Sequence, residues 1–363
     1  MILTSRRHSG LDGVRVLDLT RLLPGAYATL LLADLGADVV KVEDPRGGDS
    51  MRTLPPLSDG RNIYFDRLNR NKRSITLDLR SPAAAAVLSA LAAQSDVVVD
   101  SFRPSTARRL GVDAATLIAR HPRLVCASIS GFGQNGPYEN RAAHDINYQA
   151  LAGLLRPPAL PGPLVGDIGA AMQTALGILA ALVQRDRTGA GSVVDVSIHE
   201  AAMAWSMFPV TGDLASACYT IYETKDGRWL ALGALEPKFW AGFCERIGRP
   251  ELTRRQHAQG EERAQVLRDV REVMRARTRD EWLALFEGAD VCLTTIYKPD
   301  EVAADPHVIA RGVVADVSGI THVTPPGGDV RAAPALGAHT DEVLEAAGID
   351  TEQRARLRAA GVI

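Results

Sequence analysis

The chain has 363 residues, of which 46% are hydrophobic and 23% are charged, and its formal net charge at pH 7 is -2. This composition is ordinary for a globular protein and excludes a disordered or fibrous chain. The small net charge gives no general attraction to nucleic acid or to an anionic membrane, so neither is expected as a partner. Because the chain exceeds the usual size of one hydrophobic core, we expect two domains or one domain with a large insertion.

The cysteines are widely scattered and form no C-x-x-C pair; they are Cys126, Cys218, Cys244 and Cys292. We therefore expect no metal site and no disulfide framework. The first ten residues contain no apolar core of signal-peptide length, and no segment offers about 18 uninterrupted apolar residues. These features predict a cytoplasmic protein.

Short β-branched runs alternate with longer helical patterns in the first third of the chain, as they do in parallel α/β folds. The expected strands are 14–19, 38–43, 74–79, 96–100 and 124–130. Apolar residues recur at spacings of three and four in the expected helices, 25–35, 82–93 and 113–120. This order predicts a doubly wound, mostly parallel, Rossmann-like sheet, in which ligands bind beyond the carboxyl ends of the strands.

A long apolar segment, 168–187, is expected to be one helix ended by the glycines that follow it. The pattern of expected strands and helices changes after this segment. Shorter strands are then expected at 217–223, 229–235 and 291–297, mixed with charged helices such as 262–277. We expect a large α/β domain over 1–205, a smaller α+β domain over 206–324, and a C-terminal segment over 325–363 that returns to the large domain.

One glycine pattern imitates a nucleotide-binding motif. The segment from Gly131 to Gly136 matches G-x-G-x-x-G and follows an expected strand. A dinucleotide site needs a helix that begins at these glycines, whereas Pro137 and polar residues follow here. We therefore interpret the segment as a flexible loop beside a site.

Cations cluster on loops next to the expected strands, where they suit the phosphates of a nucleotide-like ligand. The side chains concerned are Lys41, Arg70, Lys72, Arg73, Arg103 and Arg108. Each of them taken alone is more often a solvated turn residue, so only their convergence would matter. The absence of a G-x-x-x-x-G-K-[ST] segment disfavours a P-loop NTPase.

Two ionisable residues, His144 and Asp167, lie beside expected helix starts. Asp145 could cap the helix after His144, and Asp167 could cap the long helix, so capping is the simpler interpretation of both aspartates. The functional interpretation is acid–base chemistry at the carbon next to a thioester carbonyl, where one group removes a proton and the other returns one to the opposite face. The N–H groups of the helix after Gly166 would then stabilise the enolate oxygen. Asp167 could instead attack the carbonyl and form a mixed anhydride, which is a covalent route for moving CoA between acids.

Glu236 is a third catalytic candidate. Pro237 at a first helical position leaves Glu236 at the end of a strand, where it could orient the His144 imidazole or share a proton with it. A carboxylate that favours the helix macrodipole is an equally good interpretation.

Several segments together resemble the class III CoA-transferase family, also called the carnitine dehydratase/bile-acid-inducible family, which includes alpha-methylacyl-CoA racemase. They are 13–20, 28–43, 69–79, 122–125, 130–137 and 336–344. The resemblance implies a doubly wound large domain, a small domain and an interlocked homodimer of two threaded chains. It also implies that coenzyme A, as part of the acyl-CoA substrate and without a further cofactor, lies on the large domain. The residues that would lie near its nucleotide are Lys41, Arg70, Lys72, Arg73 and Arg103.

The resemblance is closest to the racemase branch, through 144–148, 166–167, 236–239 and 290–294. There, Asp167 and His144 match the two acid/base residues, whereas in the transferases the matching aspartate is the nucleophile. Ala143 replaces the usual glycine and no glycine run follows Asp167, so CoA transfer stays open as the alternative. A non-catalytic CoA-binding module is a further alternative, and a nicotinamide-dependent oxidoreductase ranks below it.

Overall fold

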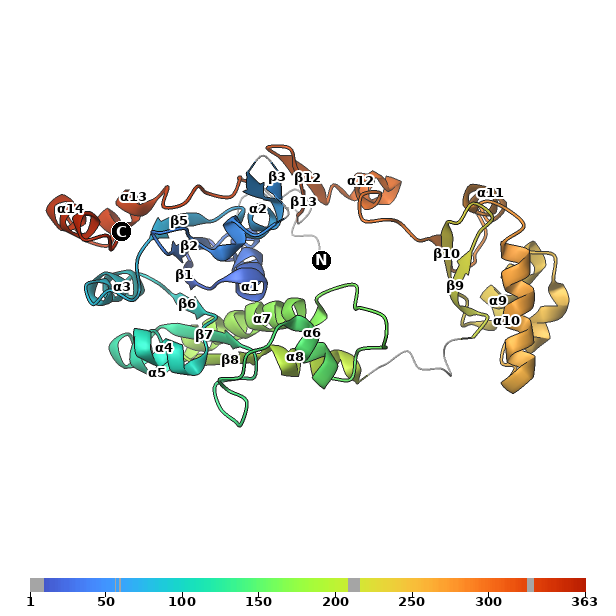
Figure 1. Ribbon diagram of the computed structural model, residues 1–363, viewed down its shortest axis with the longest axis horizontal. Helices are drawn as coiled ribbons and strands as arrows, with labels where there is room; N and C mark the ends of the chain where they lie inside the picture. The colour runs from blue at the N-terminus through green and yellow to red at the C-terminus, as the bar shows by residue number, and fades with distance from the viewer. Residues whose placement is uncertain (1–9, 56, 59, 208–215, 325–329) are drawn as a thin grey trace. The chain divides into compact units, whose positions relative to one another are not determined.

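The computed structural model describes residues 10–55, 57–58, 60–207, 216–324 and 330–363. The chain divides into two compact units, one made of Met1–Met207 with His307–Ile363 and the other of Phe208–Pro306 (Figure 1). The first boundary lies at residue 207, close to the expected 205. The second lies at residue 306 rather than 324, because the hairpin of β12 (Val314–Val317) and β13 (Ile320–Val323) belongs to the first unit. Arg67 Nε donates to the Thr321 carbonyl oxygen at 3.0 Å in that unit.

The first unit is built on a six-stranded sheet in the order β5-β2-β1-β6-β7-β8, and every pairing in it is parallel. Its strands are β1 (Arg15–Leu19), β2 (Asp38–Glu43), β5 (Arg73–Thr76), β6 (Val97–Asp100), β7 (Val125–Ser130) and β8 (Val193–Ser197). The first five overlap the expected strands, and β8 lies in a stretch for which no strand was expected. The predicted α/β class with a mostly parallel central sheet is therefore confirmed.

Helices cover both faces of this sheet because neighbouring strand residues point in opposite directions. Val16 and Val97 lie in a core with α1 (Leu22–Asp34), α7 (Val165–Thr188) and α8 (Ile198–Ser206). Leu17 and Val98 lie in a second core on the other face, which includes the C-terminal residue Ile363. The helices of that face are α3 (Ala84–Ala93), α4 (Pro104–Leu110), α5 (Ala114–Arg120) and α13 (Thr340–Ala346). The last helix, α14 (Thr351–Ala359), directly precedes this C-terminus.

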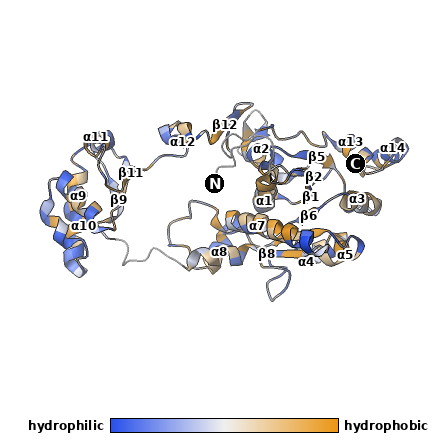
Figure 2. Cartoon of the chain, turned by 180° about the vertical axis from the view of Figure 1, so that it is seen from behind, coloured by the Kyte–Doolittle hydropathy of each residue, from blue (hydrophilic) through white to orange (hydrophobic). Residues whose placement is uncertain are grey.

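Helix α7 begins three residues earlier than expected and ends at Gly189, whose φ of 77° only glycine adopts without strain. Among the described residues it is the one helix long and apolar enough to cross a membrane, but half of its most apolar stretch is buried in the protein. Its hydrophobic residues stand out in Figure 2. Ala170 and Ile178 belong to the first core, which is the packing of a core helix, while Leu176 on another side of the helix is 66% exposed.

The second unit has an antiparallel three-stranded sheet in the order β11-β10-β9, as expected for an α+β domain. Its strands are β9 (Tyr219–Glu223), β10 (Trp229–Gly233) and β11 (Leu293–Thr295), and its main helices are α9 (Pro237–Arg246), α10 (Gly260–Met274) and α11 (Arg279–Leu285). The fully buried Trp240 and Phe243 stack with ring centroids 5.6 Å apart at the centre of its core. This unit therefore has a hydrophobic core of its own.

Candidate active site

His144 and Asp167 lie at the starts of two helices that the Asp145 carboxylate joins. Helix α6 (Asp145–Leu151) begins directly after His144, and Asp167 lies in the first turn of α7. Asp145 Oδ1 accepts a hydrogen bond from the Asp167 backbone N–H at 2.9 Å. A side chain next to His144 in sequence thus binds the backbone of Asp167, so the starts of α6 and α7 lie close together.

The expected roles of the two aspartates as caps of their own helices are wrong. His144 occupies the cap position of α6, and its backbone N–H donates to Asn147 Oδ1 at 3.0 Å. Asp145 is buried and caps the other helix, α7, while the side chain of Gln149 donates to its carboxylate. The Asp167 side chain therefore does not cap α7.

Gly166 permits the close approach of these two helix starts. A Cβ at this position would lie 3.0 Å from Asp145 Oδ1, tighter than an ordinary contact. The glycine before Asp167 is thus explained by packing. The expectation that the N–H after Gly166 would be free for an enolate oxygen is not met, because the N–H of Asp167 already donates to Asp145.

Burial raises the pKa of the half-buried Asp167 carboxyl to about 7, and the negative charge of Asp145 adds to the effect. The neighbouring Tyr148 responds in the same direction, since burial and then the charge of Asp167 raise its pKa to about 12. His144, by contrast, is exposed. At neutral pH Asp167 exists in both protonation states, so it can act as an acid or as a base.

Replacing Asp145 with asparagine should lower the pKa of Asp167. The amide oxygen can still accept the Asp167 N–H, but the like charge that opposes ionisation is removed. Because burial is the larger cause, the pKa should stay above the ordinary aspartate value. Carboxyl carbon NMR titration of specifically labelled protein measures both values, and an unchanged Asp167 pKa in Asp145→Asn would contradict the assigned coupling.

Two of the predicted phosphate-binding cations, Lys41 and Lys72, are buried in the fold, and each forms an ion pair with a carboxylate. Lys72 Nζ lies 3.2 Å from Asp18 Oδ2, and Lys41 Nζ lies 3.0 Å from Asp49 Oδ2. Burial lowers the pKa of Lys72 to about 8, against the attraction of Asp18. In this structure neither ammonium group reaches the surface, so the expected direct contact with a phosphate is not available to them.

The predicted arginines divide into paired and open side chains. Arg70 is buried against Asp34, and Arg73 Nη2 lies 2.5 Å from Asp38 Oδ2. Arg108 is exposed, with a distant contact to Glu139 at 3.7 Å. Arg103 is exposed, precedes α4 and has no ion pair within the described part of the chain. Phosphate binding therefore stays a prediction for Arg103 and Arg108 above all.

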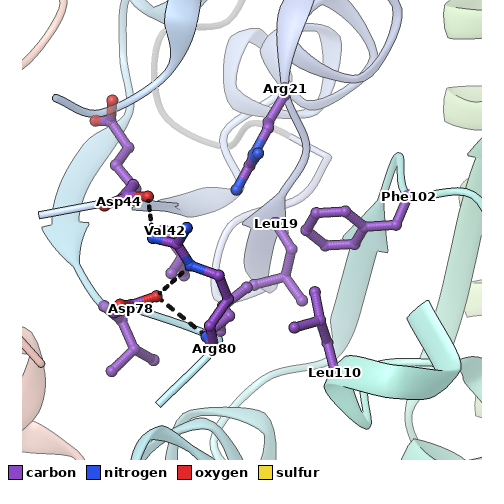
Figure 3. Close-up of a pocket in the computed structure, with 11 residues that line it drawn as sticks. Leu19, Arg21, Val42, Asp44, Asp78, Arg80, Phe102 and Leu110 are labelled. Carbon is purple, nitrogen blue, oxygen red and sulfur yellow. Dashed lines mark hydrogen bonds and ion pairs between the residues drawn. The ribbon is translucent and has the colours of Figure 1, made fainter. Parts of the chain in front are cut away.

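A pocket lies at the carboxyl ends of β1, β2 and β6, where the fold predicts a ligand (Figure 3). The Arg21 guanidinium carbon lies 5.5 Å from the centre of the Phe102 ring in this pocket. Arg80 pairs with Asp78 Oδ1 at 3.0 Å and with Asp44 Oδ2 at 2.9 Å. Arg21 and Arg80 were missed in the sequence, although Arg21 follows β1 by two residues and so could have been found from its position after a strand.

Glu236 lies in the second unit, three residues after β10, and occupies the cap position of α9. Its side chain is exposed, and Pro237 occupies the first turn of the helix as expected. A role for Glu236 beside His144 stays a prediction, because the two residues belong to different units.

Comparison with known proteins identifies the family of the chain. The model of CoA-transferase family III matches residues 11–340. Over 97% of its length the chain is 35% identical to a succinyl-CoA–D-citramalate CoA-transferase of Chloroflexus aurantiacus and 32% identical to human alpha-methylacyl-CoA racemase, covering 98% and 97% of those proteins.

A solved CAIB/BAIF family protein from Brucella suis is similar to the chain, with a TM-score of 0.82 and 28% identity over 94% of this chain and all of that one. The predicted family resemblance is thereby confirmed. With relatives that are racemases and CoA-transferases, the chain is an enzyme and belongs to CoA-transferase family III.

Proposed function

We propose that the chain is an acyl-CoA racemase or epimerase of the alpha-methylacyl-CoA type, which moves a proton at the carbon next to the thioester carbonyl. The observation that carries the proposal is the Asp167 carboxyl, whose pKa is raised to about 7 and whose backbone N–H is bound by Asp145, the residue after His144. A carboxyl that can take or give a proton at neutral pH, together with an imidazole, suits a two-base exchange.

In the forward direction one of the two groups, His144 or Asp167, takes the α-proton, and the electron pair of the C–H bond moves toward the thioester oxygen. The other group then gives its proton to the opposite face of the carbon, and the enolate returns to the thioester. No bond to CoA breaks, and the two groups have exchanged protonation states. Proton exchange with water restores the enzyme. Glu236 is proposed to support His144.

CoA transfer is the second candidate, and the similarity to the Chloroflexus transferase favours it. Asp167 would attack the thioester carbonyl, expel the CoA thiolate and form a mixed anhydride, from which the thiolate generates an aspartyl-CoA thioester and a free acid. An acceptor carboxylate would then repeat these steps in reverse. This route needs Asp167 as an anion, which its raised pKa disfavours below about pH 7.

We place the CoA part of the substrate at the carboxyl edge of the sheet. Arg21 and Phe102 offer a cation and an aromatic ring there, and Arg103 lies within electrostatic reach of Tyr148, which senses the charge of Asp167. A ligand that runs from the pocket past Arg103 would place its thioester toward Asp167. We propose no cofactor beyond coenzyme A itself.

We also propose the interlocked homodimer that the family resemblance implies. Apolar side chains are exposed on α7 and α8, where Leu176 is 66% and Trp205 is 54% exposed. Groups of exposed apolar residues commonly mark protein interfaces. A solution mass of one chain by light scattering would contradict this proposal.

The reaction type is testable with acyl-CoA thioesters in heavy water. Racemase chemistry predicts deuterium at the α-carbon without any acceptor acid, because a proton shared with His144 or Asp167 exchanges with solvent. Mass spectrometry of a panel of thioesters, with and without free carboxylates, measures label and CoA transfer together. Transfer to an added acid without label at the α-carbon would establish the transferase. If neither label nor transfer is found, the chain is a non-catalytic CoA-binding module.

A further inference from the structure

A hollow of about 410 Å³ lies at the amino ends of β6 and β7, the edge of the sheet opposite the candidate active site. The charged and titratable side chains that line it are Asp96, Arg120, His121, Arg123 and Arg185. They come from the turn before β6, the end of α5, the turn before β7 and the end of α7. None of these residues has a role in the proposed reaction.

Positive charge exceeds negative charge in this hollow. Asp96 is its one carboxylate, and Asp96 Oδ1 lies 2.7 Å from Arg185 Nη1. Arg123 donates to the Gly189 carbonyl oxygen at 3.1 Å, which leaves its charge uncompensated. Arg120 is exposed and makes no ion pair with the described residues. Arg185 Nη2 also lies 3.4 Å from Asp186 Oδ1, so the uncompensated charges are those of Arg120 and Arg123.

Two nitrogen atoms of the same lining residues are buried without a hydrogen-bond partner among the described residues. They are His121 Nε2 and Arg185 Nε. A buried polar atom without a partner is unfavourable, and most such atoms in folded proteins bond to protein, water or ligand. Both atoms are shielded from solvent, so a ligand in the hollow would reach them only after a shift of these side chains.

Helix ends explain part of this charge but not all of it. Arg120 and Arg185 lie in the last turns of α5 and α7, where the helix macrodipole favours cations. Arg123 and His121 lie outside both helices, between α5 and β7. The charge of Arg123 is therefore not explained by a helix end, and a guanidinium group suits a ligand with acceptor oxygens.

We propose that this hollow binds a small phosphate-bearing anion, such as a phosphate monoester. A phosphate group offers several acceptor oxygens and matches the paired donors of guanidinium groups. Asp167 and Arg185 are 18 residues apart on α7, which corresponds to about 27 Å at the helical rise. The site is therefore separate from the acyl-CoA site, and its existence does not depend on the proposed reaction.

Calorimetric titration of the full-length protein with inorganic phosphate tests the proposal, with sodium chloride at equal ionic strength as the reference. Phosphate should bind, and the double variant Arg120→Gln/Arg123→Gln should weaken binding about tenfold or more, because two charge-assisted contacts are lost. Both side chains are exposed, so the fold should tolerate the change. Arg187→Gln removes an exposed charge from the end of the same helix without touching the lining and should leave the affinity unchanged.

Two results would overturn the site. One is the absence of phosphate binding beyond the salt reference. The other is an affinity that survives in the double variant but falls in Arg103→Gln, which would place the phosphate at the carboxyl edge of the sheet instead.

Discussion

Asp167→Asn should reduce turnover about 1000-fold or more, whichever of the two reactions the enzyme performs. An amide cannot exchange a proton with the α-carbon at neutral pH, and it cannot form the mixed anhydride. The change is nearly isosteric, and the backbone N–H that binds Asp145 is retained, so the fold should be unaffected. Initial rates of deuterium uptake and of CoA transfer, both measured on folded protein, give the result.

His144→Gln is the matched variant that separates the two chemistries. Proton exchange needs a second base, so its loss should be nearly as damaging as the loss of Asp167. The covalent route has no obligatory second base, so transfer activity should survive in His144→Gln far better than in Asp167→Asn. Full activity of Asp167→Asn in both assays would remove Asp167 from the chemistry altogether.

The pH dependence of the wild-type enzyme gives a second readout of the same residue. In the direction in which Asp167 takes the proton, kcat/KM should rise as the pH rises through about 7, since only the carboxylate is a base. In the reverse direction Asp167 must start protonated, so kcat/KM should fall over the same range. In Asp145→Asn both changes should move to lower pH together with the pKa of Asp167.

The parallel sheet was predictable from the sequence because its strands are buried on both faces and read as short apolar runs. Val97, Val98 and Val99 are such a run, and two of them face one core while the third faces the other. The strand β8 was missed because Asp195 and Ser197 interrupt its apolar residues. The end of the small unit was misplaced because the hairpin at residues 314–323 pairs with itself and packs on α2 (Ile63–Asn69), a long-range contact that local patterns do not encode.

The residue types of the candidate site were predictable from the sequence, but their hydrogen bonds and ion pairs were not. His144 and Asp167 were found because each ionisable side chain lies at a helix start. The bond between Asp145 and the backbone of Asp167 joins residues 22 positions apart, and no local pattern indicates it. Lys41 and Lys72 were expected at a phosphate because they lie beside expected strands and match positions of the family. Their burial depends on the carboxylates that the fold places beside them.

The largest expected effect on stability comes from disrupting the buried ion pair between Asp18 and Lys72. Asp18→Asn should lower the free energy of unfolding of the first unit by about 3–5 kcal/mol, the usual effect of removing one partner from a buried ion pair. Asp18 is fully buried in β1, and its carboxylate also accepts from the hydroxyl groups of Thr20 and Thr29, both at 2.6 Å. Burial alone would raise the pKa of Asp18, but the charges of Lys72 and Lys41 outweigh it and the pKa is lowered. The stability from this carboxylate is therefore present above the ordinary aspartate pKa and lost as the pH falls through the lowered one.

Urea denaturation at neutral pH, followed through the exchange of β1 amide protons, measures this loss. Arg356→Ala is the control, because it breaks an exposed pair with Glu352 on α14 and should cost less than about 1 kcal/mol.

The CoA affinity of the Asp18→Asn protein tests whether the buried lysines stabilise the fold alone or also bind the substrate. If Lys41 and Lys72 serve only the fold, folded Asp18→Asn protein should bind CoA as the wild type does. If they reach the phosphates of CoA, removing the carboxylate that competes for them should tighten CoA binding. That result would assign both lysines to the substrate site.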